Sequence, residues 1–178
     1  MTLWLVRHGD TEWSEHGRLC GWADPPLRPA GIEQAARLGP KLRHRPFEGA
    51  WSSDLERASE FARLCFGKVR LDARLRELDF GDLEGKTWDE FDVETQEALM
   101  RFEGFTAPGG ESVETLWARV LGFLADMGAG SQLIFTHGGV IRLLQALSGS
   151  GQPPRPGEMV VLDWPVRGRV SAEKESLT

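Results

Sequence analysis

Two histidines and two arginines follow short apolar runs that are typical of buried β-strands; they are Arg7, His8, Arg57 and His137. In an open parallel sheet, the residues directly after the strands meet at one edge, where ligands bind. Arginine side chains match phosphate oxygens in a bidentate manner, and a helix beginning near Gly138 would add backbone N–H groups there. The sequence therefore predicts a site for a dianion such as a phosphate.

A metal ion is the alternative ligand for His8 and His137. The adjacent arginines would repel a cation, and no carboxylate cluster has the spacing of metal ligands, so we expect no metal and no cofactor. Any one of the four residues alone would be interpreted as structural or solvated, and only their coincidence favours a site. The other two histidines, His16 and His44, lie in polar surroundings and are expected at the surface.

The elements that must position these residues alternate along the chain. Strands are expected at about 3–6, 49–52, 69–71, 133–136 and 160–164. Helices are expected from 29 to about 42, from a Ser53–Glu56 capping box to 65, over 111–127 and over 140–147. This alternation predicts an α/β fold of three layers, in which helices cover both faces of a mostly parallel central sheet.

Helical periodicity identifies the faces of two of these helices. Residues on one face of the helix from Pro29 are Ile32, Ala35, Ala36, Leu38 and Leu42. The helix that begins at the Ser53–Glu56 box carries Arg57 one turn inside it. We expect both apolar faces to pack against the sheet.

Length and charge limit the class of protein. The 178 residues fit one domain over 1–166, with an excursion at about 81–110 that is expected to form a helical lid and a polar tail over 167–178. No apolar run approaches the ~20 residues that span a bilayer, and a net charge of −6 argues against nucleic acid or anionic lipid as a partner. The first apolar run is too short for a secretory signal, so a cytoplasmic protein with two thiols, Cys20 and Cys65, is expected.

Five blocks of the chain, in order, resemble the motifs of the histidine phosphatase, or phosphoglycerate mutase-like, superfamily. They are LVRHGDTEW at 5–13, SSDLERA at 52–58, LRELDFGDLEG at 75–85, PGGES at 108–112 and THGG at 136–139. An isolated Arg-His-Gly would carry little weight, whereas five ordered blocks make a chance resemblance improbable. The resemblance implies a phosphoglycerate mutase-like fold.

The resemblance also implies roles for individual residues. His8 would be the nucleophile that becomes phosphorylated, and Arg7, Arg57, His137 and Gly138 would bind the phosphoryl oxygens. Glu77 would be the catalytic acid. Glu12 and Glu111 are expected to be structural, and Glu84 is expected at a lid or structural position. Ser14 stands where the family often has an asparagine.

The physical requirements agree with these roles. His8 must be neutral to attack phosphorus, and nearby arginines lower its pKa because a second positive charge is costly. Glu77 must donate a proton to the leaving oxygen, which requires burial or neighbouring acids such as Asp79 and Asp82. No metal is needed, and water would then hydrolyse the phosphohistidine.

The predicted function is a metal-independent histidine acid-type phosphatase that hydrolyses a small phosphate monoester. Small family members imply α-ribazole 5′-phosphate, an intermediate of cobalamin synthesis, as the best substrate prediction. The alternatives are a phosphoglycerate mutase, which the short excursion and brief C-terminus disfavour, and a non-catalytic phosphate-binding module. Aromatic residues either line a mouth for an aromatic base or pack the excursion; they are Phe80, Trp88, Phe91, Phe102 and Phe105. The oligomeric state is not predicted.

Overall fold

The computed structural model describes residues 1–148 and 153–164 of the chain. Its centre is a five-stranded sheet in the order β3-β2-β4-β1-β5. The strands are β1 (Thr2–Arg7), β2 (Gly49–Ser52), β3 (Arg70–Leu71), β4 (Ser131–Thr136) and β5 (Met159–Asp163). All neighbouring pairs are parallel except β1 and β5, which are antiparallel. The mostly parallel sheet expected from the sequence is confirmed.

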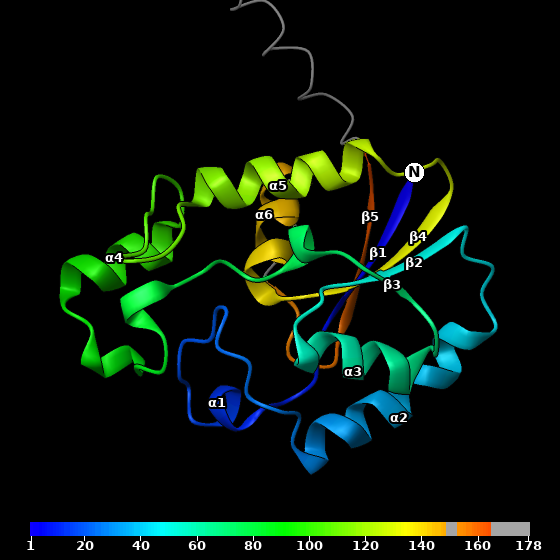
Figure 1. Cartoon of the computed structure of the whole chain (residues 1–178), viewed down its shortest axis with the longest axis horizontal. Coiled ribbons are helices and arrows are strands. Elements are labelled where there is room, and N and C mark those ends of the chain that lie inside the picture. Colours follow the sequence, from blue (N-terminus) through cyan, green and yellow to red (C-terminus); the bar gives the residue numbers. More distant parts are fainter. Residues whose placement is uncertain (149–152, 165–178) are drawn as a thin grey trace, which may run out of the picture.

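Helices cover both faces of this sheet, so the predicted three-layer α/β fold is also confirmed (Figure 1). α2 (Pro29–Arg43) and α3 (Glu56–Cys65) pack together on one face, and α5 (Val113–Ala125) and α6 (Gly138–Ser148) lie on the other. The short α1 (Glu12–Glu15) follows β1. The excursion holds α4 (Val93–Arg101) and the 3₁₀ turns Gly81–Leu83 and Trp88–Glu90; a third such turn spans Ala73–Leu75.

The alternation of side chains along β1 divides the core into two clusters. Leu3 and Leu5 point to the layer of α5 and α6, and Val6 points to the layer of α2 and α3. β4 does the same, with Ile134 on the first side and Phe135 on the second. A strand buried on both faces has to be apolar throughout, which explains the continuous apolar runs of the sequence.

The buried stripe of α2 differs from the prediction. Gly31, Ala35, Leu38 and Leu42 are buried, whereas Ile32 is 45% exposed and Ala36 is also exposed. The buried positions follow a spacing of three and four residues, and the two exposed positions lie one residue, or about 100°, further round the helix. The placement of Ile32 and Ala36 on the packed face was therefore wrong.

The predicted capping box at the start of α3 was also wrong. The helix begins at Glu56 after the N-cap Leu55, which offers no side-chain cap, and the hydroxyl of Ser53 accepts from Leu55 N (3.3 Å). The carboxylate of Asp24, from a distant loop, instead accepts the backbone N–H groups of Glu56 and Arg57. Arg57 is thus the second residue of α3 and not one turn inside it.

The helix expected over 111–127 begins two residues later, at Val113. Ser112 is its N-cap and accepts from Thr115 N (3.1 Å). Glu111 precedes this cap and lies outside the helix, and its carboxylate is paired with Arg119.

Aromatic residues of the excursion pack its interior. Four of the five candidates for an apolar mouth are buried, namely Phe80, Phe91, Phe102 and Phe105, and only Trp88 is exposed, at 43%. The packing interpretation therefore holds for the four buried rings.

Several other residues lie as the sequence suggested. His16 and His44 are exposed, and Cys20 and Cys65 are free thiols. The predicted tail at 167–178 falls outside the described residues. Within 1–148 and 153–164, none of the helices has the length and apolar character needed to cross a membrane.

Candidate phosphate site

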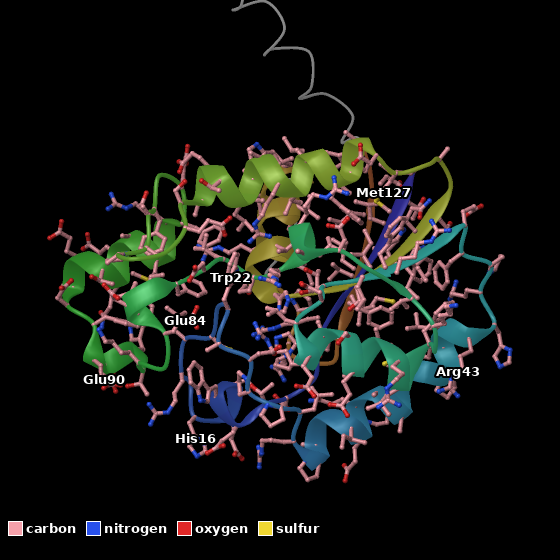
Figure 2. All side chains as sticks on the ribbon, viewed as in Figure 1. His16, Trp22, Arg43, Glu84, Glu90 and Met127 are labelled. Atoms are coloured by element: carbon pink, nitrogen blue, oxygen red, sulfur yellow. The ribbon has the colours of Figure 1, made fainter. Side chains whose placement is uncertain are left out.

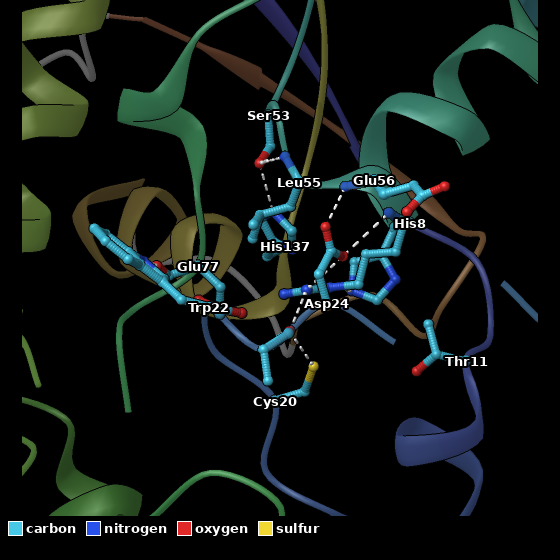
Figure 3. A network of polar contacts seen from close by, with 12 residues as sticks. His8, Thr11, Cys20, Trp22, Asp24, Ser53, Leu55, Glu56, Glu77 and His137 are labelled. Atoms are coloured by element: carbon cyan, nitrogen blue, oxygen red, sulfur yellow. Dashed lines mark hydrogen bonds and ion pairs between the residues drawn. The ribbon is translucent and has the colours of Figure 1, made fainter. Parts of the chain in front are cut away.

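The two central histidines are brought together by the pairing of β1 and β4. The register aligns Arg7 with Thr136, so His8 and His137 leave neighbouring strands at the same level. His8 N donates to Thr136 O (3.1 Å), and the two imidazole rings lie 5.1 Å apart between centroids. Figure 3 shows both rings at the centre of one polar network. The sheet edge therefore collects residues that lie about 130 positions apart in the chain.

The hydrogen bonds of His8 fix which ring nitrogen is available to a ligand. Its Nδ1 lies 2.8 Å from the backbone carbonyl of Gly9, which can only accept, so Nδ1 carries the proton. In the neutral ring, Nε2 then holds a lone pair, and Arg57 Nε–H faces it at 3.4 Å. Nε2 is the nitrogen that can act as a nucleophile.

Arg57 is held rigidly from the loop that precedes α2. Its Nη2 donates to Gly21 O (2.6 Å), and its Nη1 donates to Ala23 O (2.8 Å) and pairs with Asp24 Oδ1 (3.1 Å). The side chain is fully buried. The guanidinium is therefore fixed beside His8 before any ligand arrives.

Two buried nitrogens at the site lack a hydrogen-bond partner within the part of the chain that the structure describes. They are Arg7 Nε and His137 Nδ1. An arginine Nε always carries a proton, and a buried donor without a partner is costly, so Arg7 Nε is a donor that an anion would satisfy. Arg7 is itself anchored through Nη1 to Pro154 O (3.0 Å) and packs against Gly138, the first residue of α6.

His137 is oriented by β2. Its Nε2 lies 2.9 Å from the hydroxyl of Ser53, the residue that follows β2, and the ring is fully buried. This contact turns the unpartnered Nδ1 away from Ser53, because the two nitrogens lie on different edges of the imidazole. The three strands β2, β4 and β1 thus contribute neighbouring residues to one site.

Burial and positive charge keep both histidines neutral. Burial lowers the pKa of His8 well below 6.5, and the charges of Arg57 and Arg7 lower it further. The pKa of His137 is likewise lowered well below 6.5, first by burial and then by Arg57. A neutral His8 keeps its Nε2 lone pair at pH 7.

Glu77 faces the same edge of the sheet and is only 7% exposed. Its Oε1 accepts from Leu78 N (2.9 Å) and its Oε2 from Gly139 N (2.9 Å), which leaves a second lone pair on each oxygen. A methyl group at position 139 would collide with Oε1 of Glu77, so only glycine permits this contact. The Gly138-Gly139 pair therefore packs against both Arg7 and Glu77.

The backbone of Glu77 is held by two side chains from other elements. Arg119 Nη2 on α5 and Trp22 Nε1 both donate to its carbonyl oxygen (2.8 and 2.9 Å). Arg119 also bonds the carbonyls of Arg74 and Arg76 (2.8 and 2.7 Å) and forms a bidentate pair with the partly buried Glu111 (2.8 Å for each bond). The carboxylate of Glu77 is thereby positioned through its main chain.

Comparison with known proteins agrees with this arrangement. The sequence profile of the histidine phosphatase superfamily (branch 1) matches residues 3–160. The chain belongs to the histidine phosphatase superfamily. The probable phosphoglycerate mutase GpmB of Salmonella choleraesuis is 35% identical over 150 residues, which cover 78% of this chain and 70% of GpmB.

Solved structures of other proteins share the fold over nearly the whole chain. A phosphoglycerate mutase from Thermus thermophilus is 47% identical, with a TM-score of 0.88, and 94% of this chain and 95% of that chain are covered. A protein from Escherichia coli K-12 that is provisionally named as an α-ribazole-5′-P phosphatase is 29% identical, with a TM-score of 0.77 and coverage of 90% and 89%.

The structure brings together every residue that the sequence proposed for the candidate site: Arg7, His8, Arg57, Glu77, His137 and Gly138. Ser14 serves another purpose, because it exchanges hydrogen bonds with Thr11 in the capping box of α1. Glu84 is structural, since its carboxylate accepts the backbone N–H groups of Trp22 and Ala23 (2.6 Å each).

Sequence reasoning missed the residues that hold the site together. Asp24 and Arg119 form hydrogen bonds to Arg57 and Glu77, which lie more than 30 positions away, so no local sequence pattern predicts these contacts. Ser53 was noticed for a different role, in a capping box. Among the described residues, no group of three or more His, Cys, Asp or Glu side chains is arranged to hold a metal ion.

Proposed function

We propose that this histidine phosphatase superfamily member hydrolyses a phosphate monoester through a phosphohistidine at His8. The observation that carries the proposal is the pair of orphaned buried nitrogens, Arg7 Nε and His137 Nδ1, beside the unprotonated Nε2 of His8. A phosphoryl group is an anion of the size and charge that buried donors around one nucleophile would bind. A non-catalytic binding module would not require the nucleophilic tautomer or the nearby carboxylate of Glu77.

The reaction has two in-line steps. The lone pair on His8 Nε2 forms a bond to phosphorus while the P–O bond to the alcohol breaks, and the leaving oxygen takes a proton from Glu77. Water then attacks phosphorus, Glu77 accepts its proton, and the N–P bond electrons return to Nε2. Inorganic phosphate leaves, and His8 and Glu77 regain their first states.

The surrounding cations stabilise the transferring group. Arg7 and Arg57 donate to the oxygens that share the charge in the transition state, and His137 adds a donor when its Nδ1 carries the proton. The first turn of α6, at Gly138, contributes a positive dipole end. These groups are already fixed, so little reorganisation accompanies the reaction. The reaction proceeds without a metal or cofactor, and the protein acts in the cytoplasm.

Phosphoglycerate mutase activity is the second candidate, and the names of the Salmonella and Thermus relatives favour it. A phosphoglycerate carries a carboxylate as well as a phosphate and would need a further free cation near Glu77. Arg76, next to Glu77 in the chain, is already bound to Asp54 by two hydrogen bonds (2.8 and 2.6 Å). This neutralised arginine favours hydrolysis of a monoester, and α-ribazole 5′-phosphate is our specific substrate proposal, supported by the name of the Escherichia coli neighbour.

A substrate panel distinguishes these activities. Purified protein in excess EDTA is incubated with α-ribazole 5′-phosphate, with common sugar phosphates, and with 3-phosphoglycerate plus bisphosphoglycerate. We expect release of inorganic phosphate, fastest from α-ribazole 5′-phosphate. Conversion of 3-phosphoglycerate to 2-phosphoglycerate faster than any phosphate release would support the mutase instead, and loss of activity in EDTA would contradict a metal-independent mechanism.

A further inference from the structure

Trp22 is a tryptophan at the site whose ring is both exposed and fixed. It remains 41% exposed although its Nε1 donates to Glu77 O (2.9 Å) and its backbone N–H donates to Glu84 (2.6 Å). An indole ring that is fixed and still partly exposed offers a rigid apolar surface to a ligand. Neither the packing of the core nor the phosphoryl transfer proposed above requires this exposed ring.

The position of Trp22 places it next to the departing alcohol. The residues on either side of it, Gly21 and Ala23, use their carbonyls to hold Arg57 (2.6 and 2.8 Å), which binds the phosphoryl group in the proposed function. Its own Nε1 donates to the main-chain carbonyl of Glu77, whose carboxylate protonates the leaving oxygen in the proposed function. The exposed ring is therefore held beside the residue at which the alcohol departs in that reaction. Figure 3 shows Trp22 alongside Glu77 with its ring reaching outward from the histidine pair.

Arg76 covers one side of the ring, and the exposed part of the indole carries no charge of its own. The guanidinium of Arg76 lies over the ring at 4.9 Å from its centroid, and the charge of Arg76 is compensated by Asp54. Figure 2 shows Trp22 near the middle of the molecule, between the excursion that holds α4 and the sheet. A planar, uncharged surface of this kind binds an aromatic group by stacking and offers little to a carboxylate or a second phosphate.

We propose that Trp22 is a specificity-determining residue that stacks on the leaving group and selects phosphate monoesters of alcohols that carry a flat aromatic group. The proposal rests on the function proposed above, because it needs the alcohol to leave beside Glu77. It names a substrate class that the phosphate-binding residues alone do not distinguish.

A matched pair of substrates tests the proposal. Benzyl phosphate and cyclohexylmethyl phosphate have the same connectivity and a similar leaving oxygen, and differ in the flat aromatic ring. We expect the wild-type kcat/KM to be about 3- to 10-fold higher for benzyl phosphate, which is the range of an aromatic pair. Trp22→Leu should bring this ratio close to 1, whereas Trp22→Phe should keep most of it.

Both variants lose the hydrogen bond to Glu77, so a general loss of rate cancels in the ratio of the two substrates. Trp88→Leu is the control, since Trp88 is equally exposed but lies in the excursion and contacts Phe91; we expect its ratio to match the wild type. If Trp22→Leu fails to fold, the wild type alone still tests the proposal, because benzylphosphonate should inhibit more tightly than cyclohexylmethylphosphonate by a similar factor.

Each contrary outcome has a distinct meaning. Stacking by Trp22 would be overturned if the wild-type ratio of kcat/KM for the two substrates were near 1, or if the preference for benzyl phosphate survived Trp22→Leu. It would also be overturned if Trp22→Leu and Trp22→Phe lowered this ratio equally. These outcomes would leave the proposed phosphatase activity intact. No turnover of either substrate by the wild type would instead overturn the proposed function.

Discussion

The proton on Nδ1 of His8 decides which nitrogen of this ring would attack phosphorus in the proposed reaction. One backbone carbonyl, that of Gly9, sets this tautomer, and burial together with two arginines keeps the ring neutral. None of these contacts involves a substrate, so the fold itself prepares the proposed nucleophile. At the scale of single residues, the chemistry rests on buried neutral histidines beside buried cations.

Burial of these histidines makes stability depend on pH. The pKa values of His8 and His137 lie well below 6.5 in the folded protein and near 6.5 in the unfolded chain. Between these values only the unfolded chain takes up protons, so the free energy of unfolding falls as pH drops below about 6.5. Urea unfolding at pH 7.5 and 5.5 should show a decrease of at most about 1.4 kcal/mol per pH unit for each histidine.

His8→Gln should make this pH slope shallower, with the exposed His44→Gln as the matched control. A slope in His8→Gln equal to that of the wild type would show that His8 is not a buried neutral histidine.

The acid role of Glu77 predicts a dependence on the leaving group. Glu77→Gln keeps an acceptor oxygen and the size of the side chain but removes the transferable proton. The kcat/KM of an alkyl phosphate, whose alkoxide is a poor leaving group, should fall at least about 100-fold, and that of p-nitrophenyl phosphate much less. The ratio kcat/KM excludes the later water step, in which Glu77 is the proposed base for both substrates. Equal losses of kcat/KM would argue against the acid role of Glu77.

Several site residues could be identified from the sequence, because each stands directly after an apolar run or inside a recognisable motif. Arg7, His8 and His137 are of this kind. The contacts that tune them could not be identified, since the partner of His137 is Ser53, 84 residues away, and the carbonyl that orients His8 is a main-chain group. Residue types reveal the chemistry, but tautomer and orientation depend on three-dimensional packing.

At the scale of elements, one carboxylate joins the start of α3 to the phosphate site. Asp24 caps Glu56 N and pairs with Arg57, so Asp24→Ala should both destabilise the protein by about 1–3 kcal/mol and weaken inhibition by inorganic phosphate about 10-fold. Asp92→Ala is the matched control, because Asp92 caps α4 far from the site through Thr95 N (2.7 Å). Asp92→Ala should lose about 1 kcal/mol and leave phosphate inhibition unchanged. A similar change of inhibition in both variants would contradict the role of Asp24.

The pair of Arg119 and Glu111 connects α5 to the segment that carries Glu77. Arg119→Met leaves the partly buried carboxylate of Glu111 unpaired, so the free energy of unfolding should fall by about 2–3 kcal/mol. Arg37→Met is the control, since Arg37 forms an exposed pair with Glu33 at 3.7 Å and should change stability by less than about 0.5 kcal/mol. Chemical denaturation measures the free energy of unfolding of both variants. A loss below about 1 kcal/mol in Arg119→Met would show that this pair does not hold the segment.

Element types could be predicted more reliably than element starts. Among the described residues, the apolar periodicity located α2, α3, α5 and α6. The start of α5 is set locally by Ser112, which caps the helix through Thr115 N. The start of α3 instead depends on Asp24, a contact between distant parts of the chain. The same reason explains Ile32, whose exposure follows from which side of α2 meets the sheet.

At the scale of the whole molecule, the order of the strands creates the site. β2, β4 and β1 are neighbours in the sheet, so Ser53, His137 and His8 follow adjacent strands at one edge. The alternation of strands and helices predicted this parallel sheet, although not the antiparallel β5. A chain with a net charge of −6 thereby concentrates two arginines around a single nucleophile. A small cationic site on an otherwise acidic protein suits a compact phosphate monoester better than a polyanion.

The central claim is that a phosphoryl group passes through Nε2 of His8. Rapid quenching of the protein with a ³²P-labelled monoester, followed by peptide mapping, measures this directly. We expect an acid-labile, base-stable label on the peptide that contains His8, and neither label nor turnover in His8→Ala. A label on another residue, or turnover retained in His8→Ala, would contradict the mechanism.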